Sequence, residues 1–244
     1  MTAPAAERRS WVVQVMGLPV SLHVRGEGAR SAPAVRRAVP VVFGRLRFAD
    51  RLFSPYREDS EVSRIRRGER PSGHPWVAEV LALCELARER TDGYFDARLP
   101  GGFDPSGLVK GWAVEQSVAA LADLEGFDYC LNAGGDVVAA VRSAASPAWR
   151  VGVEDPRDRS RLVAVREVRT GGVATSGSAA RGAHIVDPHT GARPDALLSV
   201  TVTGPSLLWA DVFATAAFAR GGDVAGWVRA RAPGYEAFAV GPDP

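Results

Sequence analysis

Apolar positions in the first part of the chain follow two different periods. Val20, Leu22 and Val24 alternate with other residues after the apolar run "WVVQVMG", which predicts an opening hairpin of two strands. Over residues 33–52 the apolar residues instead recur at helical spacing. Pro40 lies inside this segment and predicts either a kink or a late start of the helix.

The rest of the chain predicts further helices and a set of short strands. Helices are expected in "PWVAEVLALCELARERTDG", which stops at Gly93, in "SGLVKGWAVEQSVAALADL" and in "SLLWADVFATAAFARGG". Short β-branched stretches predict strands in "YCLNAGG", "DVVAAV", "WRVGVEDP", "LVAVREV", "GGVATSG", "LLSVTVTG" and "EAFAV". Helices and strands do not alternate regularly, which favours an α+β domain with a mostly antiparallel mixed sheet and packed helices over a doubly wound parallel sheet.

Length and composition fit one globular domain. The chain has 244 residues, of which 46% are apolar and 24% charged. We expect a flexible N-terminus at residues 1–10 and a single domain over residues 11–244. The net charge of +2, with arginines interspersed among acids, argues against a nucleic-acid binder. The charged segment at residues 57–70 is expected to be a solvated surface.

The cysteines and the apolar runs give no indication of an oxidising compartment or of a membrane. Cys84 and Cys130 have neither metal-binding nor redox spacing and are expected to be buried free thiols. No segment reaches the roughly 18 apolar residues that would span a bilayer. The N-terminus shows no apolar core of a signal peptide and no lipid-accepting cysteine. The sequence as written therefore predicts a cytoplasmic protein, or an extracytoplasmic one if a leader has been removed.

Asp211 and Thr215 are candidate metal ligands. They stand four residues apart in a predicted helix, so their side chains share one face. A carboxylate and a hydroxyl are hard oxygen ligands of the kind that Mg²⁺ prefers. Such pairs are more often solvated, but the apolar stretches on either side of Asp211 would make an unpaired carboxylate costly. Both interpretations stay open on this window alone.

His184 is a candidate general base at the start of "HIVDPHTG". An imidazole titrates near neutral pH and can take a proton from an attacking hydroxyl, although a histidine hydrogen-bonded within a loop is the alternative. His189 is a weaker candidate nearby, and His23 and His74 are expected at the surface. Paired glycines in "NAGGDV" and "GGVATSG" allow a backbone to approach a phosphate, but plain turns explain them equally well. Neither pair matches the dinucleotide or Walker fingerprint.

Lys110 is the only lysine among the 30 lysine and arginine residues of the chain. Because arginine supplies nearly every other cation of the chain, the single lysine raises the question of which group it contacts. The alternative is that one lysine has survived in an arginine-rich composition by chance. We interpret Lys110 as a residue with a specific partner.

Nine stretches, taken in chain order, resemble the ApbE family of flavin transferases, the FAD:protein FMN transferases. They run from about residue 11 to residue 221 and are "VMGLPVSLHV", "FSPYREDSEVSRI", "TDGYFDA", "DPSGLVKGWAVE", "LNAGGDV", "WRVGVEDP", "VATSG", "HIVDPHTG" and "SVTVTGPSLLWADVFATAAFARG". The resemblance implies an enzyme that cleaves FAD at its pyrophosphate with Mg²⁺. It further implies attachment of FMN to a Thr or Ser hydroxyl of a target protein and release of AMP.

The resemblance also implies roles for individual residues. Asp211, Thr215 and the main-chain carbonyl of Gly107 would bind the metal ion. Lys110 would face the phosphate of the flavin nucleotide, and His184 would deprotonate the acceptor hydroxyl. The other residues in contact with the nucleotide would be Met16, Tyr56, Asp104, Gly134, Gly135, Asp136, Thr175, Ser176, Gly177 and Ile185.

The implied partners are FAD and an acceptor protein, without nucleic acid or a membrane span. Acceptors of the family present a motif resembling [DS]-G-[AS]-[TS]-x-T, which "TSGSAA" and "DVFATA" of this chain do not match convincingly. The segment "SAARGA" before "HIVDP" is shorter than the hairpin of many relatives and bears on acceptor choice. Two alternatives stay open: a Mg²⁺-dependent FAD pyrophosphatase that yields FMN and AMP, and a non-catalytic FAD-binding protein.

Overall fold

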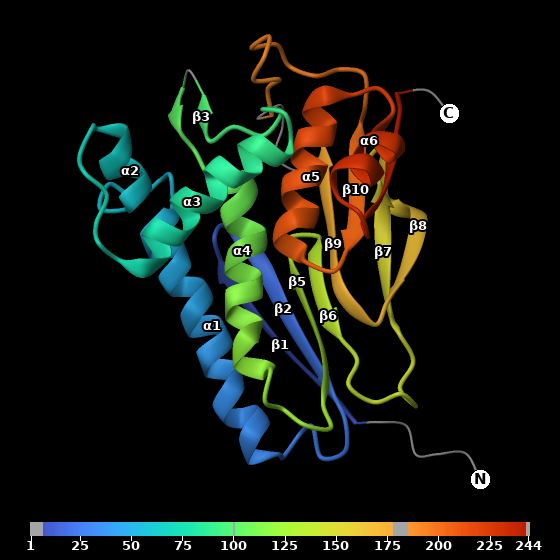
Figure 1. Ribbon diagram of the computed structural model, residues 1–244. Coiled ribbons are helices and arrows are strands. Elements are labelled where there is room, and N and C mark those ends of the chain that lie inside the picture. The colour runs from blue at the N-terminus through green and yellow to red at the C-terminus, as the bar shows by residue number, and fades with distance from the viewer. Residues whose placement is uncertain (1–6, 100, 178–184, 243–244) are drawn as a thin grey trace.

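The computed structural model describes residues 7–99, 101–177 and 185–242, and an antiparallel sheet organises them (Figure 1). Within these residues seven strands form one sheet in the order β1-β2-β5-β6-β9-β10-β11, and each neighbouring pair is antiparallel. These strands are β1 (Arg8–Val15), β2 (Leu18–Arg25), β5 (Asp128–Ala133), β6 (Asp136–Ala140), β9 (Thr170–Gly177), β10 (Ser199–Gly204) and β11 (Glu236–Val240). Two smaller pairs join β3 (Arg98–Leu99) to β4 (Gly102–Phe103) and β7 (Trp149–Asp155) to β8 (Asp158–Val168).

The sheet is covered on its two faces by different elements. The helices are α1 (Pro33–Phe53), α2 (Glu61–Arg66), α3 (Pro75–Arg90), α4 (Ser106–Val118) with the 3₁₀ turn η1 (Ala119–Leu121), α5 (Leu207–Arg220) and α6 (Val224–Arg231). Leu131 and Val138 belong to the main core with α1, α4 and α5, whereas Val137 and Ala139 pack with the β7–β8 hairpin. Side chains alternate between the faces of a strand, so β6 contributes to both cores. The structure confirms an α+β domain.

The predicted opening hairpin is confirmed, and its turn has an unusual backbone. β1 and β2 pair from Arg8 opposite Arg25 to Val15 opposite Leu18. The two turn residues, Met16 and Gly17, have φ values of 55° and 68°, as a type I′ turn requires at both central positions. Residues 8–10, which we assigned to a flexible N-terminus, form the first part of β1.

The first two predicted long helices are present. α1 begins at Pro33 and continues past Pro40, so the predicted alternative of a late start is wrong. Proline at the first helical position needs no amide partner, which explains why the helix begins there. α3 ends at Arg90, and the Gly93 amide donates to the Arg88 carbonyl at 2.8 Å with φ of 80° at Gly93, which confirms the predicted glycine stop.

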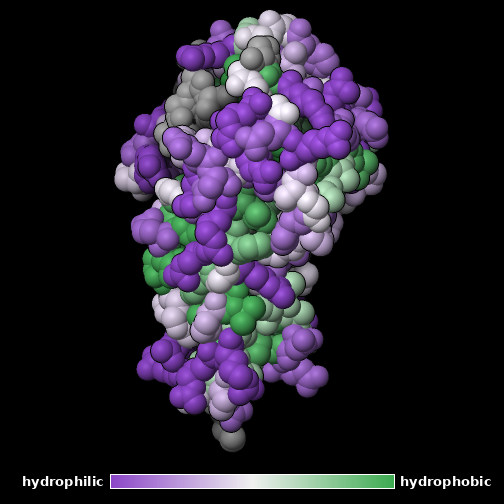
Figure 2. Space-filling view, turned by 90° about the vertical axis from the view of Figure 1, so that its left-hand side faces the viewer, coloured by the Kyte–Doolittle hydropathy of each residue, from purple (hydrophilic) through white to green (hydrophobic). Residues whose placement is uncertain are grey.

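The charged segment at residues 57–70 is only partly a solvated surface. Figure 2, which views the molecule from the side of α2, shows mostly hydrophilic side chains over this part of the surface. Beneath them, however, Ser60, Glu61 and Val62 are buried. The Ser60 hydroxyl accepts a hydrogen bond from the Ser63 amide and caps α2, so local capping and burial order a segment that charge patterning assigns to solvent.

Two histidines expected at the surface have structural partners instead. His74 caps α3, because its Nδ1 accepts a hydrogen bond from the Trp76 amide at 3.1 Å. A ring nitrogen of His23 contacts Arg8 at 3.0 Å, and burial together with the Arg8 charge lowers the pKa of His23. Both side chains are half-buried, so neither is an exposed surface residue.

Both cysteines are buried free thiols, as predicted. Burial raises the pKa of Cys84 to about 12 and that of Cys130 to about 11. Among the described residues, no helix has the length and the apolar character needed to cross a membrane.

Candidate active site

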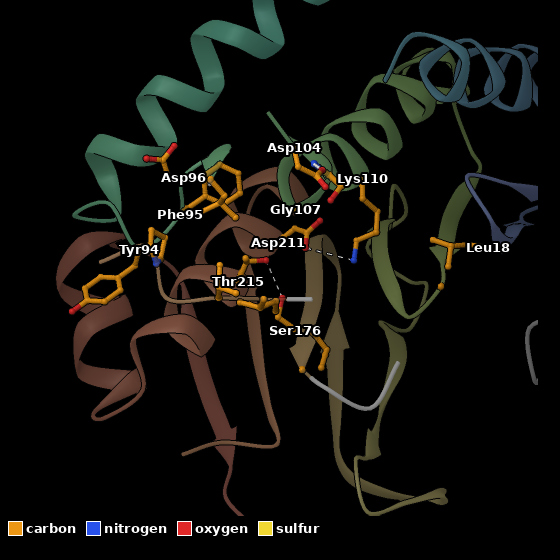
Figure 3. Close-up of a pocket in the computed structure, with 18 residues that line it drawn as sticks. Leu18, Tyr94, Phe95, Asp96, Asp104, Gly107, Lys110, Ser176, Asp211 and Thr215 are labelled. Atoms are coloured by element: carbon orange, nitrogen blue, oxygen red, sulfur yellow. Dashed lines mark hydrogen bonds and ion pairs between the residues drawn. The ribbon is translucent and has the colours of Figure 1, made fainter. Parts of the chain in front are cut away.

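Two cavities meet near the N-terminal end of α4. The smaller has a volume of about 190 Å³ and lies between α4, α5 and the end of β9, as Figure 3 shows. The larger has a volume of about 630 Å³ and lies between the β1–β2 turn, the end of α1 and α4. Leu18, Asp104, Ser106 and Lys110 line both cavities. The two cavities are therefore adjacent, and together they are called the cleft.

Asp211 is a buried carboxylate in the wall of the smaller cavity. Its exposed fraction is 1%, which excludes the alternative of a solvated helix surface. One oxygen, Oδ2, accepts a hydrogen bond from the Gly111 amide at 3.2 Å, and Oδ1 lies 3.6 Å from Lys110 Nζ. Thr215 lines the same cavity one turn further along α5, and its hydroxyl is 3.0 Å from that of Ser176.

Lys110 connects two buried carboxylates. Its ammonium forms ion pairs with Asp136 of β6 and with Asp211 of α5. Asp136 is 1% exposed, and its other oxygen accepts a hydrogen bond from the Thr175 amide of β9 at 3.1 Å. The lysine side chain keeps 17% of its surface exposed. The single lysine thus ties α4 to α5 and the sheet while it still lines both cavities.

Close contact between α4 and α5 brings this cluster together. Gly111 faces α5, where an added Cβ would lie 3.0 Å from the Leu207 oxygen and 3.1 Å from the Asp211 Cβ. Glycine therefore lets the two helices approach until Lys110 reaches Asp211. One turn earlier, a Cβ on Gly107 would lie 3.4 Å from the Thr215 hydroxyl, so Gly107 is next to Thr215.

Replacing Gly111 with Ala is expected to lower the free energy of unfolding by about 1–3 kcal/mol, because the new methyl group meets backbone atoms that cannot move independently. This clash outweighs the gain in helix propensity. Gly44→Ala in α1 is the matched control, since nothing lies within 4 Å of its added Cβ, and it should stabilise the protein by roughly 0.5–1 kcal/mol. Urea denaturation of both variants measures the two changes, and equal effects would contradict the packing argument.

Glu115 of α4 holds the N-terminal end of α5. Its carboxylate accepts hydrogen bonds from the Ser206 hydroxyl at 3.2 Å and from the Leu207 amide. The first amides of a helix have no partner within the helix, so this contact sets how α5 sits along α4. Burial raises the pKa of Glu115, and the hydrogen bonds from residues 206–208 oppose that rise.

The stability of the protein is expected to depend on pH through Glu115. Because its pKa is higher in the folded than in the unfolded protein, the folded state binds more protons between the two values. The free energy of unfolding should therefore fall as pH rises from the ordinary glutamate range through the folded pKa, and this contribution should be constant above it. Glu115→Gln keeps an acceptor for Leu207 and should remove that slope. Urea denaturation over a pH series measures it, with exposed Glu125→Gln as the control that should keep the wild-type slope.

The structure brings most of the predicted site residues to the cleft. The smaller cavity is lined by Asp104, Gly107, Lys110, Gly134, Thr175, Ser176, Gly177, Ile185, Asp211 and Thr215. The larger one is lined by Met16 and Tyr56 as well as Asp104 and Lys110, and Tyr56 is 94% exposed. Asp136 lies behind Lys110 in the sheet. His184 and the segment "SAARGA" lie outside the described residues.

The two glycine pairs have structural explanations. Gly134 and Gly135 form the turn between β5 and β6, with φ values of 62° and 103°, and the Gly135 amide donates to the Asn132 side chain at 2.9 Å. In "GGVATSG", a Cβ on Gly172 would lie 2.6 Å from the Leu207 Cα. A Cβ on Gly171 would lie 2.3 Å from the Gly204 oxygen. Turn geometry and close packing therefore account for these four glycines, of which only Gly134 also lines the smaller cavity.

Sequence reasoning on single residues missed part of the cavity wall. The loop after α3 contributes Tyr94, Phe95 and Asp96 to the smaller cavity, and the chain after residue 184 contributes Val186 and Pro188. The signals that could have found them were the stretches "TDGYFDA" and "HIVDPHTG", which the family resemblance includes as a whole. The wall is also formed by Leu18, Leu99 and Ser106.

Comparison of the sequence with protein families gives a match to the ApbE family over residues 97–239. The FAD:protein FMN transferase of Escherichia coli K12 is 33% identical over 135 residues, which cover 50% of this chain and 38% of that protein. The FAD:protein FMN transferase of Haemophilus influenzae is 30% identical over 133 residues, which likewise cover 50% of this chain and 38% of that protein. The match thus spans well under half the length of these curated relatives.

Solved structures with the ApbE fold superpose on nearly the whole chain. The ApbE protein of Thermotoga maritima has a TM-score of 0.82 at 20% identity, covering 96% of this chain and 94% of that one. The flavin transferase ApbE of Vibrio cholerae has a TM-score of 0.76 at 21% identity, covering 96% and 97%. These similarities show a shared fold. Since the family match extends over more than half of the sequence, the chain belongs to the ApbE family.

Proposed function

We propose that this protein transfers FMN from FAD to a Thr or Ser hydroxyl of an acceptor protein and releases AMP, assisted by Mg²⁺. The observation that carries the proposal is the cluster of Asp211, Lys110 and Asp136 at the junction of the two cavities. The name FAD:protein FMN transferase of the Escherichia coli and Haemophilus influenzae relatives supports the same activity.

The shape of the cleft supports an extended dinucleotide as the substrate. Small-molecule sites usually occupy a few hundred cubic ångströms and have few polar groups in fixed places. Here the larger cavity, with Met16 and Tyr56 at its wall, would take the flavin. Lys110 lines both cavities, so the phosphates would lie beside its ammonium between the two compartments.

The oxygen donors of the smaller cavity fit Mg²⁺. Asp211 supplies a carboxylate, Thr215 a hydroxyl and Gly107 a main-chain carbonyl, and such hard oxygens suit this ion. A main-chain carbonyl has two lone pairs, so the Gly107 oxygen can accept a hydrogen bond within α4 and still bind a metal ion. When bound, Mg²⁺ would neutralise phosphate charge.

In the proposed reaction the acceptor hydroxyl oxygen bonds to the FMN phosphorus and the pyrophosphate P–O bond breaks, so that AMP leaves. His184 takes the hydroxyl proton as general base. Lys110 stabilises the negative charge that develops on the phosphoryl oxygens. Asp136 and the Thr175 amide behind it hold the lysine chain in place, so the ammonium needs little reorganisation during the reaction.

Intact mass spectrometry tests the proposed function. A peptide or protein with the motif [DS]-G-[AS]-[TS]-x-T is incubated with this protein, FAD and Mg²⁺, and AMP is followed in parallel. The expected result is a mass gain equal to one FMN phosphoester with one AMP released, both lost in His184→Ala. AMP without acceptor modification would instead indicate a pyrophosphatase, and FAD binding without either product would indicate a flavin-binding protein.

A further inference from the structure

His189 joins two loops that are far apart in the sequence. Its Nε2 donates a hydrogen bond to the Asp92 carbonyl, 97 residues away, at 2.9 Å. Its ring also packs edge-on against Tyr94, with ring centroids 4.6 Å apart and an interplanar angle of 69°. The same imidazole therefore makes a polar and an aromatic contact with the loop after α3.

The turn that carries His189 is held by its own hydrogen bonds. The Asp187 amide donates to the Ala192 carbonyl and the Gly191 amide to the Asp187 carbonyl, both at 2.8 Å. The Asp187 carboxylate accepts from the His189 amide and from the Thr190 hydroxyl, both at 2.9 Å. The turn thus presents the His189 ring from a preorganised backbone.

The partner loop has a strained backbone where His189 contacts it. Asp92 has a φ of 54° and Gly93 a φ of 80°. A non-glycine residue in this region persists where its surroundings determine its conformation. His189 binds the Asp92 carbonyl, and Arg231 of α6 forms an ion pair with the Asp92 carboxylate at 2.7 Å. At Gly93 an added Cβ would lie 3.2 Å from the His189 ring, so the two loops are in close contact.

Both loops supply walls of the smaller cavity. Tyr94, Phe95 and Asp96 follow directly after Asp92 and Gly93, and Val186 and Pro188 flank the start of the turn. We propose that His189 is a positioning residue that holds these two loops together, so that the cavity is formed before FAD binds. This inference rests on the proposed function, because it assigns the smaller cavity to part of the FAD molecule.

The expected kinetic effect follows from preorganisation. Without the His189 contacts, ordering of the two loops would have to accompany FAD binding and would weaken it. His189 touches no reacting atom in this proposal, so its loss should act mainly on FAD binding and less on the chemical step, to which it is linked only through the segment that follows His184. His189→Ala should therefore raise KM for FAD about tenfold, the combined effect expected of one hydrogen bond and one aromatic pair, and lower kcat by a smaller factor.

Two further variants separate the contacts of His189. His189→Gln keeps an N–H donor for Asp92 and should recover part of the affinity, and His189→Phe keeps only the ring packing on Tyr94. His23→Ala, at a half-buried histidine of β2, is the control and should show wild-type KM. If kcat fell by the same factor by which KM rose, and the urea midpoint of unfolding were lowered as well, His189 would have a general structural role. That result would overturn the proposal.

Hydrogen–deuterium exchange of the full chain without FAD provides a readout that does not depend on catalysis. Amides in residues 91–96 and 185–191 should exchange faster in His189→Ala than in the wild type, with other regions unchanged. If exchange in these two loops is unchanged, the proposed positioning role of His189 is overturned, even if FMN transfer is confirmed. A wild-type protein that neither binds FAD nor releases AMP would instead refute the proposed function, and the exchange result would still decide whether His189 joins the loops.

Discussion

Asp211→Asn is expected to abolish flavin transfer while the protein stays folded. Asparagine has the same shape as aspartate and keeps an oxygen for the Gly111 amide, which donates to Asp211 at 3.2 Å. It removes the negative charge, however, and with it the only anionic donor among the three proposed metal ligands. Loss of preorganised electrostatic stabilisation at a reacting centre costs on the order of 10³-fold in rate, and we expect a loss of at least that size.

The measurement is the initial rate of AMP release together with intact mass spectrometry of the acceptor. Asp123→Asn, at an exposed position after η1, is the matched control and should transfer FMN at the wild-type rate. The Mg²⁺ concentration that gives half-maximal rate should rise in any residual activity of Asp211→Asn. Transfer at the wild-type rate in this variant would remove Asp211 from the proposed metal site.

Lys110→Met is expected to lose both stability and activity. The change leaves the Asp136 and Asp211 carboxylates, each 1% exposed, without the ammonium that pairs with both. Breaking a buried ion pair by removing one partner destabilises a protein by about 3–5 kcal/mol. We expect the free energy of unfolding, measured by urea denaturation, to fall by about that amount, and transfer to become undetectable.

A second change separates the two effects of Lys110. In the double variant Lys110→Met, Asp136→Asn one buried charge is removed, so part of the stability should return. Activity should not return, because the ammonium beside the phosphates is still absent. Arg98→Met is a control at the exposed pair of Arg98 and Glu85, where little change is expected since exposed ion pairs contribute little. A Lys110→Met variant as stable as the wild type would contradict the structural role of this lysine.

The family resemblance and the local patterns named many of the residues that line the cleft, but not the contacts among them. Asp211 and Thr215 could be placed on one helix face because residues four apart share a face in any α-helix. Lys110 could be singled out because it is the only lysine in an arginine-rich chain. Its pairing with Asp136 was not predicted, since the two residues lie on α4 and β6, and no local pattern relates a helix position to a strand position.

Short elements and charged segments were the least predictable parts of the fold. The helix α2 lies in a segment that charge patterning assigned to solvent, and α6 was not predicted. Each begins after a residue whose side chain accepts a hydrogen bond from an amide of the first turn, Ser60 for α2 and Asp223 for α6. Helices this short are not stable by propensity alone and depend on caps and on packing. At Pro40 the predicted late start is wrong, because the packing of α1 outweighs the cost of one missing hydrogen bond.

The sequence by itself determined the strands of the main sheet and the long helices, where α3 and α5 end, and which residue types are available for chemistry. These properties depend on backbone geometry and on neighbours within a few residues. Only the tertiary structure decided that Gly111 lets α4 approach α5, that Lys110 lies between Asp136 and Asp211, and that His189 reaches Asp92. Such contacts join positions as much as 101 residues apart, as Lys110 and Asp211 are, and they arise from the packing of whole elements, which no local pattern records.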